Sequence, residues 1–378
     1  MVGGLNRVER RPTVAVIDRS ALRHNFTALR ERVPPSVKVM AVVKANAYGH
    51  GAVEVARELE SQGCDCLGVA LCEEGVGLRE AGITAPIIVL GGTYPDQIKG
   101  LLHYNLTPVV FDMRILSELN DMAREARRVV DIHLKVDTGM GRLGLLPHQV
   151  PPFLDRLKGL DHIHLAGVLS HFATADEEDR NYAERQLASF LAVVETIRGR
   201  GYDPKLIHMA NSAAAVDLPA SHFNLIRPGI MLYGSYPGRQ FREKIDLKPA
   251  MKIKTEILQL KKVPKGFPVS YGRRYVTGRE SVIATIPAGY GDGYPRSLSG
   301  SGELLVRGKR AGVTGTICMD LTMLDVTSIE GVSVGDEVVL LGRQGEEEIR
   351  VEEVAERAGT ISYEIFCNIS VRVPRVYI

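Results

Sequence analysis

The stretch that decides the fold is MAVVKANAYGHG, residues 40–51. It begins inside a short run of apolar and β-branched residues, 37–43, which is typical of a strand buried on both faces. The run ends at Lys44, and two glycines then allow a tight turn before a helix-like segment over residues 52–59. The pattern predicts a strand, a loop that opens with a lysine, and a helix.

The same unit of apolar run, polar break and helix-like stretch recurs along the chain. The apolar runs cover residues 37–43, 66–71, 87–90, 107–111, 131–136, 164–169, 206–209 and 223–226. Strands that alternate with helices at this spacing predict parallel βα units. Eight such units predict an α/β fold of the (β/α)8 TIM-barrel type, which typically needs about 250 residues.

Reactive and polar residues follow several of these strands, at the rim that carries active sites in this fold. Lys44 is one of them, and an amine held against an apolar strand end has a lowered pKa because desolvation disfavours its charged form. Such an amine suits covalent chemistry with a carbonyl compound. The structural alternative is a lysine whose stem lies on the rim with its ammonium group in water.

Beyond residue 247 the pattern changes to short β-like runs separated by glycine-rich turns. The runs cover residues 251–258, 281–286, 303–306, 309–313, 321–326 and 337–341, with a helix over 351–358 and a closing strand over 369–373. The pattern predicts a second, mostly β domain. We expect the barrel at residues 12–246 and the β domain at 247–378, with residues 1–11 as a candidate addition to the latter. A β-like run at 13–17 fits either domain.

The bulk composition limits the classes of protein. The chain has 378 residues, of which 45% are hydrophobic and 24% charged, and a net charge of +2, so nothing favours nucleic acid or an acidic membrane as partner. Its five cysteines are an odd count that fits a reducing compartment, and Cys64 and Cys66 have no second pair to complete a metal site. There is no secretory signal and no apolar run of about 20 residues. We expect a cytoplasmic protein without a metal.

A family resemblance rests on segments spread over nearly the whole chain. They are AVVKANAYGHG (41–51), KVDTGMGRLG (135–144), LSHFATAD (169–176), NSAAA (211–215), RPGIMLYG (227–234), VSYG (269–272), GYGDGYPR (289–296) and ICMDLTMLDV (317–326). Together they resemble alanine racemases, a family with a pyridoxal-phosphate barrel fused to a β domain. The resemblance implies interconversion of L- and D-alanine, which supplies D-alanine for cell-wall precursors.

The resemblance also implies roles for individual residues. Lys44 matches the lysine that holds pyridoxal 5'-phosphate covalently, and it would act with Tyr271 as the two bases on opposite faces of the substrate Cα. Residues matched to the cofactor or its supports are Tyr48, His171, Ser212, Arg227, Gly229, Ile230 and Tyr363. Independently of the family, the loops after strands seven and eight are a common phosphate site in barrels. Taken alone, Ser212 could be a helix cap, Gly229 a plain turn and Arg227 a salt-bridging residue.

A second set of residues is matched to the substrate. Arg142 would meet its carboxylate. Lys135, in an apolar strand, is carboxylated in many family members, and a lysine neutralised by Asp137 is the alternative. Met319 matches a residue that bounds the small substrate. The supporting residues are Tyr290 and Tyr363, which narrow the entrance, and Asp320, whose role is open.

In the family Tyr271 enters the active site from a second subunit, so the resemblance implies a homodimer with shared sites and an amino-acid substrate. Three other functions remain open. The first is a broader racemase for serine or basic amino acids, and the second is a non-catalytic pyridoxal-phosphate carrier, against which the β domain argues. The third is a related decarboxylase, which typically has a glutamate where this chain has Arg227.

Overall fold

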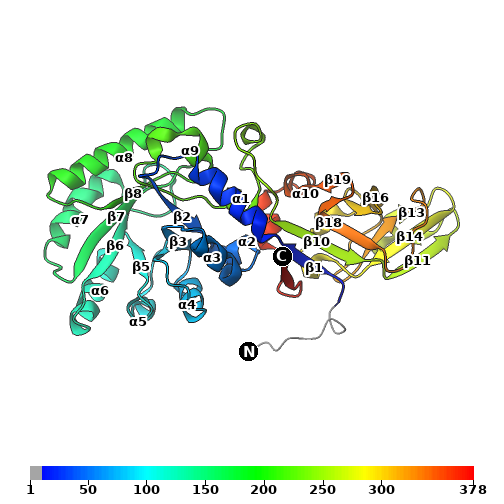
Figure 1. Ribbon diagram of the computed structural model, residues 1–378, viewed down its shortest axis with the longest axis horizontal. Helices are drawn as coiled ribbons and strands as arrows, with labels where there is room; N and C mark the ends of the chain where they lie inside the picture. Colours follow the sequence, from blue (N-terminus) through cyan, green and yellow to red (C-terminus); the bar gives the residue numbers. More distant parts are fainter. Residues whose placement is uncertain (1–10) are drawn as a thin grey trace. The chain divides into compact units, whose positions relative to one another are not determined.

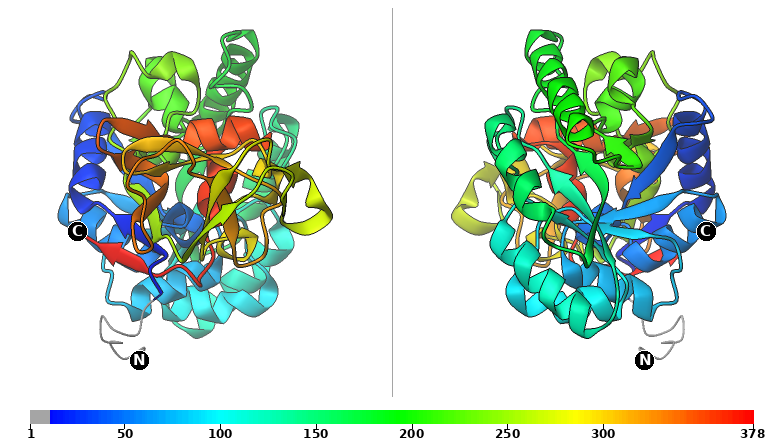
Figure 2. Two further views of the ribbon diagram at one scale, coloured as in Figure 1. Left: turned by 90° about the vertical axis from the view of Figure 1, so that its right-hand side faces the viewer. Right: turned by 90° about the vertical axis from the view of Figure 1, so that its left-hand side faces the viewer.

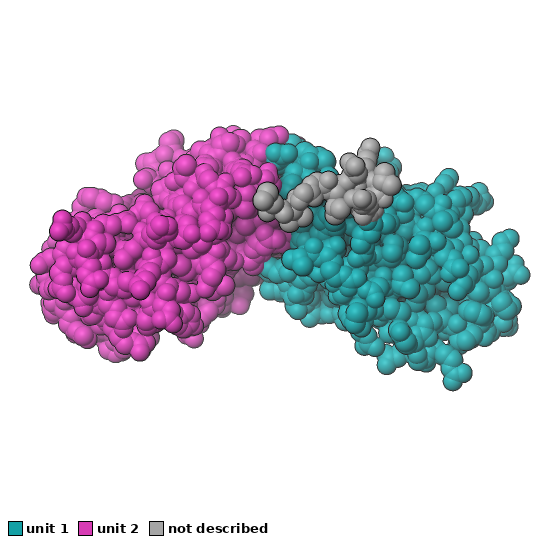
Figure 3. Space-filling view, turned by 90° about the horizontal axis from the view of Figure 1, so that it is seen from below, with its two compact units in different colours: residues 1–21, 249–378 teal, residues 22–248 magenta. Residues whose placement is uncertain are grey.

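The computed structural model describes residues 11–378, so the expectation for the first ten residues lies outside the described residues. The chain divides into two compact units, coloured separately in Figure 3. One contains residues 22–248, which we call the barrel unit. The other contains residues 249–378 together with residues 11–21, which we call the β unit.

The barrel unit is built on eight parallel strands. They are β2 (Lys38–Val42), β3 (Cys66–Val69), β4 (Ile87–Val89), β5 (Thr107–Val110), β6 (Val130–Lys135), β7 (Ile163–Leu169), β8 (Leu206–His208) and β9 (Leu225–Ile226). Their order in the sheet is β8-β7-β6-β5-β4-β3-β2-β9. Between β8 and β9, the Ile207 amide donates to Asn224 Oδ1 at 2.7 Å, and the Arg227 amide donates to the Ala210 carbonyl at 2.9 Å. The barrel is therefore nearly closed, which confirms the predicted fold class.

Helices surround these strands, as the two views in Figure 2 show. They are α1 (Arg19–Arg30), α2 (Lys44–Tyr48), α3 (Ala52–Ser61), α4 (Cys72–Glu80), α5 (Ile98–His103), α6 (Met113–Glu125), α7 (Val150–Leu157), α8 (Asn181–Gly199) and α9 (Ser212–Asp217). Helix α6 shows why they form: the Asp112 carboxylate caps its N-terminus by accepting from the Arg114 amide, and Ile115, Leu116 and Leu119 form its buried face.

The β unit holds a large sheet with the order β11-β14-β17-β16-β15-β18-β10-β1-β20. Its strands are β1 (Val14–Ile17), β10 (Met251–Glu256), β11 (Gln259–Val263), β14 (Ser281–Ile286), β15 (Glu303–Val306), β16 (Lys309–Val313), β17 (Thr322–Asp325), β18 (Glu337–Gln344) and β20 (Arg375–Tyr377). The short strand β19 (Glu347–Ile349) pairs with β18, and β12 (Pro268–Val269) with β13 (Tyr275–Val276) forms a separate hairpin. Helices α10 (Val351–Ala358) and α11 (Ser362–Cys367) complete the unit, which is labelled in Figure 1.

Strand β1 lies in the β unit, whereas we expected the barrel to start at residue 12. It pairs antiparallel with β10 and parallel with β20, and its inward residues Ala15 and Ile17 are fully buried. The unit boundary accordingly falls after Ala21. The closing strand is also displaced from the expected residues 369–373 to β20, because Val373 donates its amide back to Ser370 in a turn and Pro374 follows.

Among the described residues, no helix has the length and apolar character needed to cross a lipid bilayer.

Candidate active site

Lys44 stands where β2 ends and α2 begins, at the carboxyl end of the barrel strands. The turn that follows is left-handed: Ala45, Asn46, Ala47 and Tyr48 have φ angles of 50–53°. Each such residue other than glycine costs about 1–2 kcal/mol. The glycines of the sequence predict a tight turn at Gly49 and Gly51, whereas the structure begins the turn at Ala45. Strain of this kind persists only where the surroundings enforce it.

Side chains on both sides enforce the turn. The Glu74 carboxylate, in the first turn of α4, accepts from the Ala45 amide at 2.6 Å and from the Ala70 amide at 2.7 Å. On the other side, Asn46 Oδ1 accepts from the Ala52 amide at 2.8 Å. The Lys44 loop is thereby fastened to the start of both α3 and α4, which fixes the direction in which its amine leaves the strand.

Tyr48, Ser212 and Gly229 meet beside this turn. The Gly229 amide donates to Ser212 Oγ at 2.8 Å, and a Cβ on Gly229 would lie 2.5 Å from the Tyr48 hydroxyl oxygen. Asn211, and not Ser212, caps α9 by accepting from the Ala214 amide at 3.0 Å, so the cap alternative for Ser212 is wrong. The plain-turn alternative for Gly229 fails as well, because only glycine leaves the Tyr48 hydroxyl its place.

This cradle suits an anion. The hydroxyls of Tyr48 and Ser212 can each donate a hydrogen bond, and Ile230 begins the 3₁₀ turn Ile230–Tyr233, whose first amides have no acceptor inside the turn. Donors that converge on a space kept open by a glycine can hold a phosphate group. Tyr233, which has no signal in the sequence, supports the cradle: its ring packs 4.9 Å from that of Tyr48, and its hydroxyl donates to the Val42 carbonyl at 2.8 Å.

Arg227 is buried at the end of β9, and all its bonding partners among the described residues are neutral groups. Its guanidinium donates to the Ser170 and Met209 carbonyls at 2.8 and 3.0 Å, and to Nδ1 of both His171 and His208 at 3.1 Å. Among residues 11–378 it has no carboxylate partner, so the salt-bridge alternative is wrong. Burial, and after it the charge of a neighbouring arginine, lowers the pKa of Arg227 to about 9, which keeps it protonated at neutral pH.

A buried histidine pair lies behind Arg227. His208 accepts from Arg227 through Nδ1, so its Nε2 carries the hydrogen and donates to Nδ1 of His133 at 2.8 Å. Burial lowers the pKa of both rings, that of His133 to about 4. Gly167 on β7 leaves room for the pair, because a Cβ there would lie 2.7 Å from the His133 ring. Histidines inside two predicted strands were the signal that could have revealed it.

Lys135 is the last residue of β6, and only 8% of it is exposed. Burial, and then the positive charges of Arg227 and Arg142, hold the pKa of its amine well below the ordinary value of 10.5. Asp137 does not bond to it: the Asp137 oxygens accept from the amides of Gly139 and Arg142, both at 2.9 Å, and the Asp137 charge only partly offsets the lowered pKa of Lys135. Within the described part of the chain Lys135 has no ion-pair partner, and its lowered pKa favours the neutral form of the amine.

The barrel unit thus brings together most of the predicted residues at one rim. They are Lys44, Tyr48, Lys135, Arg142, His171, Ser212, Arg227, Gly229 and Ile230. The electrostatics agree with this proximity, since burial and the positive charges of Arg227, Lys135, Arg142 and Lys44 together lower the pKa of His171. His171 is therefore a neutral ring with its Nδ1 occupied by an arginine.

The β unit carries the remaining predicted residues. Tyr271, Tyr290 and Met319 are unusually open for large side chains, with 72%, 41% and 52% of their surface exposed. The segments are joined by their backbones, because the Tyr290 amide donates to the Cys318 carbonyl at 3.0 Å. Tyr363 lies on α11.

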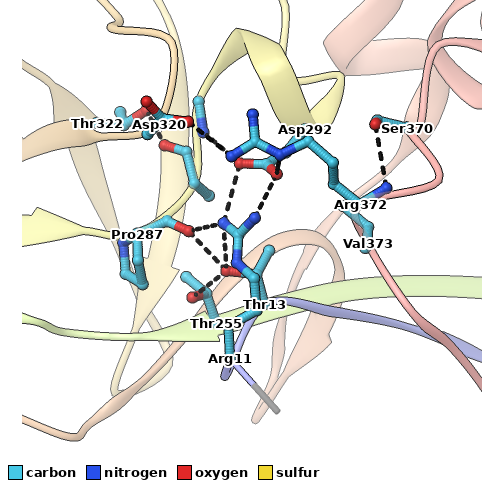
Figure 4. A network of polar contacts seen from close by, with 12 residues as sticks. Arg11, Thr13, Thr255, Pro287, Asp292, Asp320, Thr322, Ser370, Arg372 and Val373 are labelled. Atoms are coloured by element: carbon cyan, nitrogen blue, oxygen red, sulfur yellow. Dashed lines mark hydrogen bonds and ion pairs between the residues drawn. The ribbon is translucent and has the colours of Figure 1, made fainter.

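Asp320, whose role was open, belongs to the network of ion pairs in Figure 4. Its carboxylate accepts from Arg372 at 2.6 Å, and Arg372 also faces Asp292 at 3.6 Å. Asp292 is buried, pairs with Arg11 at 2.6 Å, and accepts from the Gly289 amide at 3.1 Å. The network ties the two loops that hold Met319 and Tyr290 to the C-terminal segment.

Comparison with known proteins matches this architecture in both units. Residues 17–237 match the alanine racemase N-terminal domain and residues 250–377 the alanine racemase C-terminal domain. Alanine racemases from Geobacter sulfurreducens and Halothermothrix orenii are each 47% identical, over 98% and 99% of this chain and 98% of their own. The structure of alanine racemase from Bacillus anthracis with bound L-Ala-P is 40% identical, with a TM-score of 0.92 over 97% of this chain and 95% of that one. The chain belongs to the alanine racemase family.

Proposed function

We propose that the protein is an isomerase that interconverts L-alanine and D-alanine with pyridoxal 5'-phosphate as cofactor. Membership of the alanine racemase family supports the reaction. The observation that carries the cofactor is the cradle in which Gly229 leaves space beside the hydroxyls of Tyr48 and Ser212, next to the strained turn that begins at Lys44. A lysine amine and a phosphate cradle side by side are what this cofactor requires.

Lys44 would hold the cofactor through its Nζ, while Tyr48, Ser212 and the backbone at Gly229 and Ile230 bind the phosphate. When bound, the cofactor withdraws electrons from the Cα of the amino acid and makes the Cα proton acidic. The protein supplies direction and proton acceptors. Because Glu74 fastens the loop at the Ala45 amide, the Lys44 amine keeps its position when it takes up and returns that proton.

Racemisation requires a proton acceptor on each face of the Cα, and we assign the two roles to Lys44 and Tyr271. A tyrosine has an ordinary pKa near 10, so it needs help to act as a base at neutral pH. His171 is suited to give that help. Its Nδ1 accepts from Arg227, so its Nε2 carries a hydrogen that can be donated to a phenolate. A donor next to the phenolate lowers the pKa of the tyrosine.

Arg227 would partner the pyridine nitrogen of the cofactor. It stays protonated and its other partners are neutral, so it donates to that nitrogen and does not give it a full proton. Arg227 would thereby moderate the electron withdrawal that the cofactor supplies, which would limit transamination. The His208–His133 pair fixes Arg227 from behind.

Arg142 would bind the substrate carboxylate through its guanidinium. We propose that Lys135 is carboxylated and orients Arg142, because a neutral amine is the form that reacts with CO₂ and burial favours that form here. The resulting anion would lie near Arg142 and Arg227, whose charges already act on this site. It would add negative charge to that of Asp137, whose oxygens are occupied by backbone amides.

The exposed residues of the β unit support a homodimer in which each chain completes its neighbour's site. Tyr271, Met319 and Tyr290 would cover the partner's barrel mouth, with Asp320 holding Met319 through Arg372. Tyr363 would narrow the same entrance and reach the phosphate. A narrow entrance lined by tyrosines favours a methyl side chain and disfavours larger ones. We further propose a cytoplasmic role in supplying D-alanine for cell-wall precursors.

The test is turnover by the purified protein. L-alanine is incubated with the protein and pyridoxal phosphate, D-alanine is measured by chromatography on a chiral phase, and the mass of the complex is measured by light scattering. We expect D-alanine at a rate that depends on Lys44, and a dimer. No turnover by protein that has bound its cofactor would contradict the proposed reaction.

The broader racemase is the second candidate, favoured only by the shared architecture. L-serine, L-lysine and L-arginine assayed beside L-alanine separate the two. Comparable kcat/KM values for serine or a basic amino acid would replace the proposal, whereas a strong preference for alanine supports it. A carrier without catalysis would bind the cofactor and turn over none of them.

A further inference from the structure

We propose that Ser270 and Thr316 are positioning residues that fix the direction of the Tyr271 side chain; this inference rests on the proposed role of Tyr271 as a base. Tyr271 lies at the tip of the hairpin formed by β12 and β13. Its surface is 72% exposed, and among residues 11–378 no hydrogen bond or ring contact restrains its phenol. The direction of the phenol therefore depends on the backbone that carries it.

That backbone is strained immediately before the tyrosine. Ser270 has φ 65° and ψ −175°, a conformation that is essentially confined to glycine. The next glycine along, Gly272, has φ 71°, which costs it nothing. Ser270 thus occupies a backbone conformation that would suit a glycine. We infer that its side chain makes an interaction that offsets the strain and that a glycine could not make.

The serine hydroxyl provides such an interaction. Ser270 Oγ donates to the Thr316 carbonyl at 2.5 Å, and Thr316 Oγ1 donates in return to the Tyr271 carbonyl at 3.0 Å. Two hydrogen bonds in opposite directions thus join consecutive residues of the hairpin tip to one residue of a neighbouring segment. They hold the Ser270 side chain on one side of the Tyr271 Cα and the Tyr271 carbonyl on the other, and the phenol projects from that Cα.

Gly315 shows how closely the two segments approach. A Cβ on Gly315 would lie 2.7 Å from the Val269 carbonyl oxygen and 2.9 Å from the Ser270 Cβ. The segment that follows Thr316 then runs to Cys318 and Met319, whose carbonyls accept from the neighbouring loop. Ser270 and Thr316 therefore connect the proposed base to the same backbone frame as the wall residue Met319.

The two hydrogen bonds that Ser270 and Thr316 make, which we call the clamp, matter for proton transfer because a proton moves only over hydrogen-bond distances. A displacement of about 1 Å costs on the order of a hundredfold in rate. Without the clamp the tip of the hairpin can relax to unstrained angles and carry the phenol away from its working position. Loss of these two hydrogen bonds therefore slows the proton transfer by Tyr271 and leaves the rate of proton transfer by Lys44 unchanged.

The experiment compares the primary isotope effects on kcat/KM for α-deuterated L-alanine and α-deuterated D-alanine. The variants are Thr316→Val, which removes the hydroxyl, Thr316→Ser, which keeps it, and Ser270→Gly, which removes both the hydroxyl and the backbone strain. Ser299→Ala is the matched control, because Ser299 Oγ accepts from the Ile317 amide at 3.0 Å in the same segment but does not touch the hairpin tip.

We expect Thr316→Val and Ser270→Gly to lower kcat between tenfold and a hundredfold. The isotope effect should rise for the enantiomer that gives its proton to Tyr271 and fall for the other, because in that direction the Lys44 step no longer limits the rate. Ser270→Gly should do this with no loss of melting temperature. Thr316→Ser and Ser299→Ala should keep both isotope effects at the wild-type values.

Isotope effects that stay unchanged in Thr316→Val and Ser270→Gly, or that shift equally for both enantiomers, would overturn the positioning role. These outcomes differ from failure of the proposed function. If that function is wrong, the unaltered protein does not racemise alanine, or Tyr271→Phe racemises it as well as the unaltered protein does.

Discussion

The phosphate cradle gives a sharp prediction for Gly229→Ala. Gly229 has φ −124°, outside the left-handed region that favours glycine. The added methyl group would lie 2.5 Å from the Tyr48 hydroxyl oxygen and 3.1 Å from the ring carbon that carries it. To reach ordinary contact at 3.4 Å, the Tyr48 hydroxyl must move by about 0.9 Å.

The surroundings decide what that movement costs. Tyr48 is 6% exposed and its ring packs on Tyr233, so it cannot swing into solvent. A hydroxyl displaced by this distance no longer forms its hydrogen bond to a phosphate. Losing one hydrogen bond to a charged group costs about 1.5–3 kcal/mol, which corresponds to roughly 10- to 150-fold weaker binding of the cofactor.

The assay is titration of cofactor-free protein with pyridoxal phosphate, followed by its absorbance, with thermal unfolding of the cofactor-free form measured in parallel. Gly77→Ala is the matched control, because Gly77 lies on α4 and a Cβ there meets nothing within 4 Å. We expect weaker binding for Gly229→Ala and unchanged binding for Gly77→Ala.

A double-mutant cycle tests the cause. Tyr48→Phe removes the oxygen atom and with it both the hydrogen bond and the closest contact. If Gly229→Ala acts by displacing that oxygen, the double variant binds the cofactor little worse than Tyr48→Phe alone. Fully additive losses, or wild-type affinity in Gly229→Ala, would refute the reasoning.

Three further predictions concern the groups around Arg227. Arg227→Glu should raise the amount of pyridoxamine phosphate formed per turnover, measured by chromatography of the released cofactor, and lower racemisation without that by-product would contradict the proposed role. Protein equilibrated with ¹³C-labelled CO₂ should show a carbamate signal by NMR, and Lys135→Ala should lose this signal. The variant should also have a KM for alanine raised about tenfold. An unmodified Lys135 amine in the unaltered protein would contradict the proposed carboxylation. Burial keeps His133 and His208 neutral, so the unfolded chain binds protons that the folded barrel does not, for His133 between pH 6.5 and about 4 and for His208 below pH 6.5. The free energy of unfolding should therefore fall by about 1.4 kcal/mol per histidine for each pH unit as the pH drops through these ranges. Urea unfolding of the wild type and His133→Asn checks this, and equal slopes would contradict it.

The alternation of strands and helices predicts the barrel well, because each strand ends at a marked polar break. Lys44 at the end of β2 follows from this pattern with no knowledge of the family. The strand β1 shows the limit: four alternating residues show that a strand forms, but not which sheet it joins. Its partners β10 and β20 lie more than 230 residues away in sequence, and the residues around β1 do not indicate which strands it pairs with.

Some residues of the candidate site can be predicted from the sequence pattern and others cannot. Ser212 and Gly229 can be placed at the phosphate rim from their positions after strands seven and eight. Tyr271 cannot, because an exposed tyrosine in a hairpin is an ordinary feature, and only the family resemblance singles it out. The left-handed turn after Lys44 is not predicted because three of its four residues, two alanines and a tyrosine, disfavour that conformation, and only Asn46 adopts it readily. Its causes are the contact of Asn46 with Ala52 at the start of α3 and the contact of Ala45 with Glu74 on α4, of which only the second is distant in sequence.

The central claim is that the Lys44 amine holds the cofactor at the barrel mouth. The most direct measurement is reduction of the cofactor-loaded protein with borohydride, followed by digestion and mass spectrometry of the peptides. The account predicts the added pyridoxyl phosphate mass on Lys44 alone, and no label in Lys44→Ala. Label on a different lysine, or none on protein that racemises alanine, would contradict it.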